Sequence, residues 1–258
     1  MKQRAGAEPS TVYFVGSGPG DPDLITVKGR RLLEEADVVV YAGSLVREKA
    51  LMYCKKDVEV HNSASMHLKE IMEVMVSASR AGRKVVRLHA GDPSLYGAVR
   101  EQADILEKES IRYEIVPGVS SAFASAAALK RELTMPGVTQ TVIFTRIEGK
   151  TPVPRAESLS SLASHNATIC VFLSIGMIDR VVVELAKGYP PSTPAAVVYR
   201  ATWEDELAIT GTLEDIAGKV KKAGISRQAM IIVGRAIGEG SVASRLYDKG
   251  FSHGFRRS

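Results

Sequence analysis

Short runs rich in valine and isoleucine alternate with segments of helical period through the first half of the chain, and this alternation constrains the fold more than any other feature. A strand followed by a crossover helix and then by a second strand is typical of a parallel sheet. We predict strands at residues 11–16, 37–41, 57–60, 84–89 and 112–116. The fold class is therefore α/β.

Segments at 26–36, 67–82 and 101–110 have the spacing of helices between these strands. In the second of them the apolar residues fall on one helical face, because they recur at intervals of three and four. That face is rich in methionine, and we interpret it as part of the core rather than as a cofactor site. Its members are Leu68, Ile71, Met72, Met75 and Val76.

After Gly118 an alanine-rich helix leads into a region where strands dominate, and several of these could pair antiparallel. Thr212 and Asp215 predict the start of one more helix, with the Thr212 side-chain oxygen accepting a free backbone N–H. We expect an N-terminal α/β domain at 11–117, a C-terminal α/β domain at 118–240 and a ligand cleft between them. A polar, basic tail follows at 241–258.

Composition narrows the classes of function. The formal net charge is +5, but the basic residues are interspersed with acids, so an anionic small molecule is a better partner than a nucleic acid. Cys54 and Cys170 have no metal-binding spacing, so we expect no metal site and a reducing, cytoplasmic location. Neither a signal peptide nor an apolar run of membrane-spanning length is present, which argues against export and membrane insertion.

The stretch "VGSGPGDPDLIT" at 15–26 follows the first predicted strand and has the look of a nucleotide-phosphate loop. Three features argue against that interpretation: the glycines alternate strictly, Pro19 and Pro22 lack the amide donors a phosphate needs, and Asp21 would repel it. Gly-Asp-Pro recurs at 91–93, again directly after a strand. Two such loops at strand ends predict a pocket for an uncharged or zwitterionic ligand.

Three motifs, "VGSGPGDPDLITVKGRRLLEEADVVVY", "GDPSLYG" and "IVPGVSS", resemble those of the tetrapyrrole (corrin and porphyrin) methylases over residues 11–240. This resemblance implies two α/β domains with S-adenosylmethionine bound in the cleft, S-adenosylhomocysteine as its product, and a homodimer. "SASMHLKE", "ELTMPGVTQTVIFTRIEGKTPVP" and "YRATWEDE" resemble the branch of the family that methylates carbon 11 of precorrin-4 or cobalt-precorrin-4 in cobalamin synthesis.

The resemblance also implies cofactor-binding positions, many of them small residues that let the backbone approach a ligand. Asp92 has two interpretations, because it could face the cofactor or cap the turn that Pro93 stiffens. The expected cofactor-binding residues are Pro19, Ala90, Gly91, Asp92, Leu95, Ser120, Ser121, Phe172, Leu173, Ser174, Ala201, Ala229 and Met230.

A precorrin carries a ring of carboxylates, so arginines near strand ends are candidates for binding it. Arg87, Arg146 and Arg200 have such positions, and an ion pair within the protein is an equal alternative for each. A general base could be needed to remove a proton from the product. We assign no catalytic residue, because sequence alone does not choose among His61, His67, His89, Glu148 and Tyr199.

Departures from the family pattern narrow the substrate. Ala42 and Asn62 stand where uroporphyrinogen methylases carry an acid and a lysine, which argues against that substrate, and Gly43 replaces an aspartate common in the carbon-11 branch. The chain's ending favours the metal-free substrate of the oxygen-dependent route. Two alternatives stay open: a sibling methylase acting on another ring carbon or on cobalt-precorrin-4, and an RNA-modifying methylase, against which the absence of stacking-aromatic motifs counts.

Overall fold

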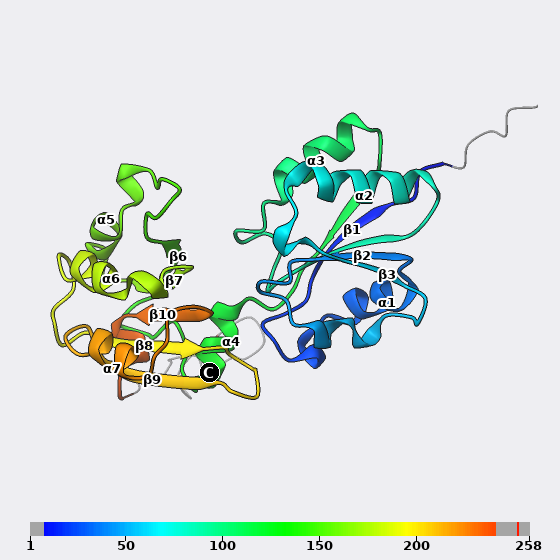
Figure 1. The fold of residues 1–258 in the computed structure, drawn as a ribbon. Helices are drawn as coiled ribbons and strands as arrows, with labels where there is room; N and C mark the ends of the chain where they lie inside the picture. Colours follow the sequence, from blue (N-terminus) through cyan, green and yellow to red (C-terminus); the bar gives the residue numbers. More distant parts are fainter. Residues whose placement is uncertain (1–7, 241–251, 253–258) are drawn as a thin grey trace, which may run out of the picture. The chain divides into compact units, whose positions relative to one another are not determined.

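The computed structural model describes residues 8–240 and Ser252, and it divides into two compact units (Figure 1). The first unit comprises the chain up to Ala124 together with Thr202–Glu204, and the second comprises Ser125–Ala201 and the chain from Asp205 onward. The basic tail expected at 241–258 lies outside the described residues except for Ser252.

A five-stranded sheet forms the centre of the first unit, and all its strands are parallel, which confirms the prediction from the alternating pattern. The third strand begins two residues later than predicted, because the Val58 N–H donates to the Lys55 carbonyl and closes a turn first. In the order β3-β2-β4-β1-β5 the strands are Glu59–Asn62, Val38–Tyr41, Val85–His89, Val12–Gly16 and Tyr113–Val116.

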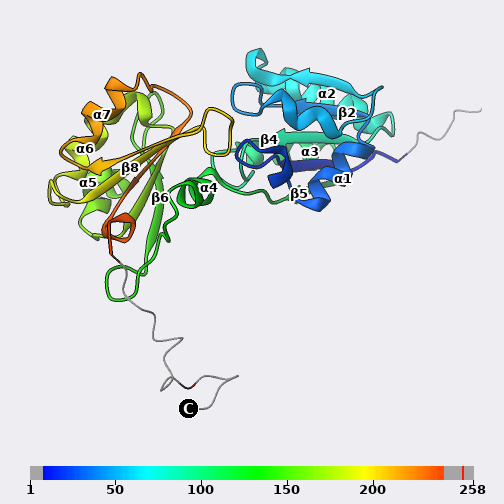
Figure 2. The ribbon, with the colours of Figure 1, turned by 90° about the horizontal axis from the view of Figure 1, so that it is seen from below.

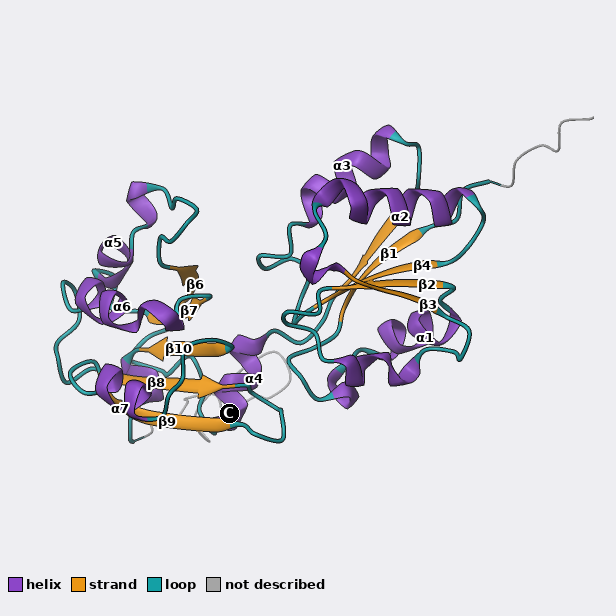
Figure 3. Ribbon diagram, in the orientation of Figure 1, coloured by secondary structure: helices purple, strands orange, loops and turns teal. Residues whose placement is uncertain are grey.

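Helices cover both faces of this sheet, with α1 (Val27–Glu35) on one side and α2 (Leu68–Arg80) and α3 (Val99–Lys108) on the other (Figure 3). Alternate strand residues therefore pack against different helices. Phe14 joins Met72 and Met75 in one buried cluster, and Val15 joins Leu33 in the other. The methionine-rich face of α2 is core, as predicted, and Met75 is fully buried.

Short 3-10 turns complete the first unit at Pro22–Leu24 (η1), Glu48–Tyr53 (η2) and Ser63–Ser65 (η3). The start of α2 is held by a reciprocal cap. His67 Nδ1 accepts the Glu70 N–H at 3.3 Å, and the Glu70 carboxylate accepts the His67 N–H at 2.9 Å. His67 thus has a structural task at a helix end, where four backbone N–H groups need partners.

The second unit has a mixed sheet, in which β6 and β7 are parallel and the remaining neighbours are antiparallel, as the sequence predicts. Helices α5 (Leu159–Ala163), α6 (Ile178–Leu185) and α7 (Ile216–Lys222) lie on one side of it (Figure 2). Helix α4 (Ser121–Ala128) crosses from the first unit to the second, and η4 (Arg155–Glu157), η5 (Ile175–Met177) and η6 (Arg235–Ile237) are short turns. In the order β6-β7-β10-β8-β9 the strands are Val142–Arg146, Thr168–Phe172, Ala229–Val233, Pro194–Tyr199 and Leu207–Thr212.

Two details differ from the expectations for this half. Helices α5 and α6 are not among the expected elements; in α6, Ile178, Val181 and Leu185 are buried at helical spacing although valine favours strands. The predicted Thr212 cap is wrong, since the bond runs the other way: the Asp215 carboxylate accepts the Thr212 N–H at 2.9 Å. A carboxylate binds donors more strongly than a hydroxyl does, which explains why Asp215 is the acceptor. The Lys219 ammonium and this N–H stabilise the ionised carboxylate and so lower the pKa of Asp215.

Candidate functional site

Three glycine-containing loops meet at the carboxyl ends of the neighbouring strands β4, β1 and β5. A Cβ atom on Gly16 would lie 2.5 Å from the Gly91 carbonyl oxygen and 2.7 Å from the Gly118 Cα, and one on Gly118 would lie 2.2 Å from the Gly91 oxygen. Real side chains do not tolerate such distances, so the loops contact each other backbone to backbone. Close approach of this kind requires glycine.

The two loops that share Gly-Asp-Pro are joined by a short antiparallel bridge. The Gly91 N–H donates to the Gly18 carbonyl at 2.9 Å, and the Gly18 N–H donates to the Gly91 carbonyl at 3.3 Å. Gly18 and Gly91 have φ angles of 78° and 62°, in the left-handed region that favours glycine. The repeated motif therefore fixes the two loops to each other.

The backbone after β1 lacks the geometry of a phosphate loop. The Asp21 carboxylate accepts the Asp23 N–H at 2.9 Å and so caps the turn η1. Helix α1 starts only at Val27, and Thr26 Oγ1 already accepts the Gly29 N–H at 3.1 Å. A phosphate would need free amides at that helix end, so the structure supports the prediction that this loop is not a phosphate site.

Asp92 connects the second loop to the third. Its Oδ1 accepts the Ser94 N–H at 2.8 Å, and its Oδ2 accepts the Gly118 N–H at 2.9 Å. Both carboxylate oxygens thus already have backbone partners. The geometry is that of a turn cap, the second of the two roles considered for this residue.

The structure places all the expected cofactor-binding residues of the first unit on these loops. Ser120 is buried, and its Oγ accepts the Ala122 N–H at 3.3 Å, while Ser121 is the first residue of α4. Most of the others are neither fully buried nor fully exposed, as suits a lining. The set is Pro19 on the first loop, Ala90, Gly91, Asp92 and Leu95 on the second, and Ser120 and Ser121 on the third.

In the second unit the expected residues gather at one edge of the sheet. Phe172 ends β7, Tyr199 ends β8, and Ala229 begins β10, with Ala229 paired to Tyr199. Non-glycine residues with positive φ adjoin them: Leu173 at 54°, Arg200 at 44° and Gln228 at 55°. Strained backbone of this kind is enriched at functional sites. The remaining members of the set, Ser174, Ala201 and Met230, lie beside these turns.

Ser174 secures the turn after β7. Its side chain is fully buried, and its Oγ donates to the Phe172 carbonyl at 2.6 Å and accepts the Ile147 N–H at 3.0 Å. The first bond closes the left-handed turn at Leu173, and the second joins this turn to the end of β6. Leu173 itself is 61% exposed.

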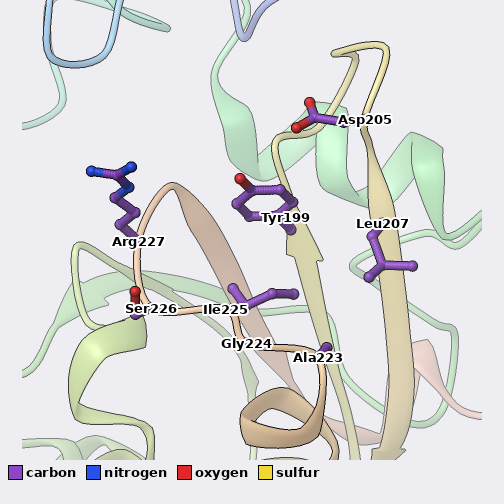
Figure 4. A pocket seen from close by; sticks show the side chains of 8 residues that line it. All are labelled: Tyr199, Asp205, Leu207, Ala223, Gly224, Ile225, Ser226 and Arg227. Atoms are coloured by element: carbon purple, nitrogen blue, oxygen red, sulfur yellow. The ribbon is translucent and has the colours of Figure 1, made fainter.

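An open cavity of about 440 Å³ lies beside the same edge of the second unit (Figure 4). Tyr199, one of the candidate bases, lines it, and the adjacent Arg200 bonds to the lining residue Asp205 at 2.5 Å. The lining of the cavity combines apolar and polar groups. Its lining is Tyr199, Asp205, Leu207, Ala223, Gly224, Ile225, Ser226 and Arg227.

The buried position of Arg87 on β4 argues against its expected contact with substrate carboxylates. It is 6% exposed, and its guanidinium donates to Gln102 Oε1 at 3.1 Å, Ser63 Oγ at 3.0 Å and the Val40 carbonyl at 3.2 Å. Burial lowers its pKa to about 10. These contacts fit the alternative of an internal arginine that joins β4, β2 and α3.

Arg146 and Arg200 lie nearer the surface, but each already has partners. The Arg146 guanidinium donates to the carbonyls of Thr151 at 3.2 Å and Pro152 at 2.8 Å, and so holds the loop after β6. Arg200 donates to Gln228 at 2.8 Å as well as pairing with Asp205. A substrate carboxylate would have to replace or share these contacts.

His89 is the candidate base with the most unusual environment. It is 4% exposed at the end of β4, and its Nε2 is buried without a hydrogen-bond partner. Burial and the nearby Arg87 charge lower its pKa to about 3, so the imidazole is neutral at physiological pH. His61, by contrast, contacts the Glu59 carboxylate at 2.7 Å. The geometry therefore singles out no base.

Sequence reasoning missed several residues that build this region. Gly16 entered only as part of a motif and Gly118 only as part of a motif and as the domain boundary, yet their lack of a side chain allows the three loops to touch. Thr202 and Trp203 also contact the first loop. The signal for the glycines was their position at or directly after a strand end. Nothing in the local sequence pattern indicated that Thr202 and Trp203 contact the first loop.

Two kinds of feature are absent from the residues that the structure describes. No helix among them is long and apolar enough to cross a membrane. No group of three or more histidine, cysteine, aspartate or glutamate side chains in the same part of the chain is arranged to hold a metal ion.

Two sheets flanked by helices, with glycine-containing loops at the strand ends of the first, define an α/β protein, and similarity to known proteins specifies the family. The sequence profile of the Tetrapyrrole (Corrin/Porphyrin) Methylases matches residues 11–217. The chain belongs to this family.

Two curated relatives illustrate the similarity. A protein of Methanocaldococcus jannaschii named cobalt-precorrin-4 C(11)-methyltransferase is 58% identical over 96% of this chain and 96% of its own length. One of Pseudomonas aeruginosa named precorrin-4 C(11)-methyltransferase is 46% identical, over 95% of this chain and 98% of its own. The match in each case extends through both units.

Solved structures agree with the family. A cobalt precorrin-4 methyltransferase superposes with a TM-score of 0.87 and 49% identity, covering 89% of this chain and 96% of the other. A uroporphyrin-III C-methyltransferase of Thermus thermophilus, complexed with S-adenosyl homocysteine, gives a TM-score of 0.75 at 32% identity, covering 88% of this chain and 93% of the other. The expected tetrapyrrole methylase fold is confirmed.

Proposed function

We propose that this protein transfers a methyl group from S-adenosylmethionine to carbon 11 of precorrin-4, in its metal-free or its cobalt-containing form, in cobalamin biosynthesis. The observation that carries the proposal is the full-length match to relatives named for that reaction, up to 58% identical over 96% of the chain. The high identity to relatives named for carbon 11 argues against the alternative of a sibling methylase that acts on another ring carbon.

The loops of the first unit fit the cofactor that this function needs. They offer backbone groups and small side chains, and two backbone N–H groups already bind the carboxylate of Asp92. A Cβ atom on Gly91 would make only ordinary van der Waals contact, 3.8 Å from the Ser120 Cα, so Gly91 is not enclosed by its neighbours. S-adenosylmethionine supplies a methyl group already activated on a sulfonium. The protein is left with binding, orientation and exclusion of water.

The residues proposed to hold the cofactor divide into two groups. In the first unit the three loops, with Pro19, Gly91 and Ser120 as representatives, would contact it through backbone groups. In the second unit the left-handed residues Leu173 and Arg200 turn the backbone away from the strands at the sheet edge, where a ligand could approach it. The second set follows from the family resemblance, and substitution of Ala201 or Ala229 by a larger residue would test it.

For the substrate, the higher identity to the cobalt-precorrin-4 relative, 58% against 46%, favours a cobalt-containing precorrin-4 over the metal-free form. The preference of the chain's ending for the metal-free form depends on residues 241–258, which apart from Ser252 lie outside the described part of the chain. The net charge of +5 suits a polycarboxylate of either kind. Arg146 and Arg200 are the proposed carboxylate contacts, and Arg87 is not.

The test combines purified protein with methyl-labelled S-adenosylmethionine and either precorrin-4 or cobalt-precorrin-4. We expect label in the corrinoid product, at carbon 11 by NMR, and faster labelling of the cobalt form. Label at another carbon would establish the sibling reaction. Absence of label from both substrates, with a carbon-11 methylase of known activity as positive control, would exclude the proposed reaction.

The proposal includes a homodimer that acts in the cytoplasm. Support comes from the family resemblance and from the unpaired cysteines, Cys54 and Cys170, which suit a reducing compartment. Light scattering on the purified protein would test the dimer. Fractionation of cells that carry a tagged copy of the chain would test the location.

A further inference from the structure

The first loop is held by a short segment that is distant in sequence. Thr202–Glu204 lie between β8 and β9 in the chain and belong to the first unit. Thr202 Oγ1 accepts the Asp21 N–H at 2.9 Å, and Trp203 Nε1 donates to the Pro19 carbonyl at 2.9 Å. Two backbone groups of the loop, one on each side of Gly20, are thereby fixed by side chains.

The indole of Trp203 also determines what can stand at position 20. A Cβ atom on Gly20 would lie 2.0 Å from Cδ1 and 2.2 Å from Nε1 of the indole. The ring therefore lies directly against the loop backbone, in space that any other residue at position 20 would occupy. Glycine at position 20 and tryptophan at position 203 are complementary.

Charged residues also hold the indole. The Arg47 guanidinium lies 4.6 Å from the centroid of the Trp203 ring, and Glu204 bonds to Arg47 at 2.6 Å and to Lys49. The Lys49 and Arg47 contacts lower the pKa of Glu204 to about 2, so this carboxylate stays ionised throughout the physiological range. A guanidinium over an indole face is favourable, and its ion pair with Glu204 restricts it to that position.

We propose that Trp203 and Thr202 are positioning residues for methyl-donor binding: they hold the Pro19–Asp21 backbone in the conformation that receives S-adenosylmethionine. This inference rests on the proposed function, since Pro19 is one of the expected cofactor contacts. Preorganisation of a binding loop raises affinity because the ordering cost is met before the ligand arrives. The two residues act through the loop and need not touch the ligand.

Calorimetric titration of the full chain with S-adenosylhomocysteine tests the inference. Trp203→Phe keeps a ring beneath Arg47 but removes the donor to Pro19, and Thr202→Val keeps the shape of the side chain but removes the acceptor for Asp21. We expect each to raise the Kd about fivefold, the factor that one ordinary hydrogen bond provides. Tyr113→Phe is the matched control, since it removes a hydroxyl that donates to Glu107 at the opposite end of β5, and should leave the Kd unchanged.

Steady-state kinetics separates positioning from general damage to the fold. The KM for S-adenosylmethionine should rise about fivefold in both variants while the KM for the tetrapyrrole stays the same. Since Trp203 is the only tryptophan, the emission of the unaltered protein should also change when S-adenosylhomocysteine binds. If Trp203→Phe does not fold, as judged by circular dichroism, Thr202→Val carries the test.

The outcomes are distinct. Binding by both variants within a factor of about two of the unaltered protein would overturn the positioning role and leave the proposed function intact. Equal rises in both KM values would overturn it as well, because they indicate a general structural effect. Failure of the unaltered protein to bind S-adenosylhomocysteine would overturn the proposed function and this inference together.

Discussion

The loops at the strand ends described above are shaped by different means in the two units. In the first, the close approach of the loops depends on glycine: Gly16 and Gly118 lie so close to the Gly91 carbonyl that neither has room for a side chain. In the second, non-glycine residues adopt left-handed backbone, as at Leu173 and Arg200, and buried side-chain bonds such as those of Ser174 hold the turn. Glycine adopts left-handed backbone at little cost in free energy, whereas any other residue needs surrounding contacts that stabilise this conformation.

The difference teaches where each unit is sensitive to substitution. Where glycines meet backbone to backbone, an added methyl group has no soft neighbour to displace. Where side chains impose the turn, loss of the imposing bond matters more than a change in the turn residue itself. The following predictions test that contrast, from the largest expected effect to the smallest.

Gly118→Ala should have the largest effect, a loss of about 3 kcal/mol or more of unfolding free energy together with loss of S-adenosylhomocysteine binding. The new Cβ would lie 2.2 Å from the Gly91 oxygen and 2.8 Å from the Gly16 Cα, both of them backbone atoms. Urea denaturation and calorimetry measure the two effects.

The matched control for that substitution is Gly218→Ala in α7, where a Cβ meets nothing within 4 Å. It should be neutral or stabilise the protein by up to about 1 kcal/mol, as alanine does inside helices. Equal destabilisation by both alanines would contradict the idea that the contact among the loops is what demands glycine.

The second prediction concerns pH and the buried histidine beside the second loop. The pKa of His89 is lowered from 6.5 to about 3 in the folded protein. Between these two values the imidazole is protonated in the unfolded chain and neutral in the folded one. Its contribution to stability is therefore fully present above pH 6.5 and is lost as the pH falls toward 3. Between about pH 7 and pH 5 the loss should be about 2 kcal/mol.

Denaturation series at several pH values would measure this loss, with His89→Asn as the comparison, because asparagine takes up no proton in this range. The carboxylates and the other histidines titrate alike in the two proteins, so the difference between their pH profiles isolates His89. If the free energy of unfolding depends on pH in the same way for both proteins, His89 is not held neutral in the folded first unit, and the prediction is wrong.

The third prediction removes a bond that imposes a turn in the second unit. Ser174→Ala should cost about 1–3 kcal/mol, because it leaves the Ile147 N–H without its acceptor in a buried place. Ser164→Ala is a suitable control, since the Ser164 hydroxyl donates to a carbonyl at an exposed position. A cost for Ser174→Ala no greater than the control's would show that the turn after β7 holds itself.

The same contrast explains how much could be predicted from sequence. The parallel sheet of the first unit follows from alternation of strand and helix patterns, and its loops from glycines directly after strands, since both signals are local. The assignment of the methionine-rich face of α2 to the core is likewise correct, because periodicity reports burial.

Contacts between residues far apart in the sequence could not be predicted. The burial of Arg87 depends on Gln102 and Ser63, which lie on other elements, so an arginine at a strand end resembles a substrate contact when only the sequence is known. Helix α6 is missed because packing of Val181 and Leu185 in the core overrides the strand preference of its valines. The left-handed turn at Leu173 carries no glycine to mark it.

Leu173→Gly is the smallest effect expected and the most direct comparison of the two units, because it gives the second the device that the first uses. Leu173 is 61% exposed with φ of 54°, so glycine relieves about 1–2 kcal/mol of backbone strain, offset by its larger entropy in the unfolded chain. The unfolding free energy should change little or rise by up to about 1 kcal/mol. Val183→Gly, also 61% exposed but within α6, should instead destabilise by about 0.5 kcal/mol or more. If Leu173→Gly is the more damaging of the two in urea denaturation, the leucine side chain itself stabilises the turn, and the second unit depends on residue identity there as strictly as the first depends on glycine.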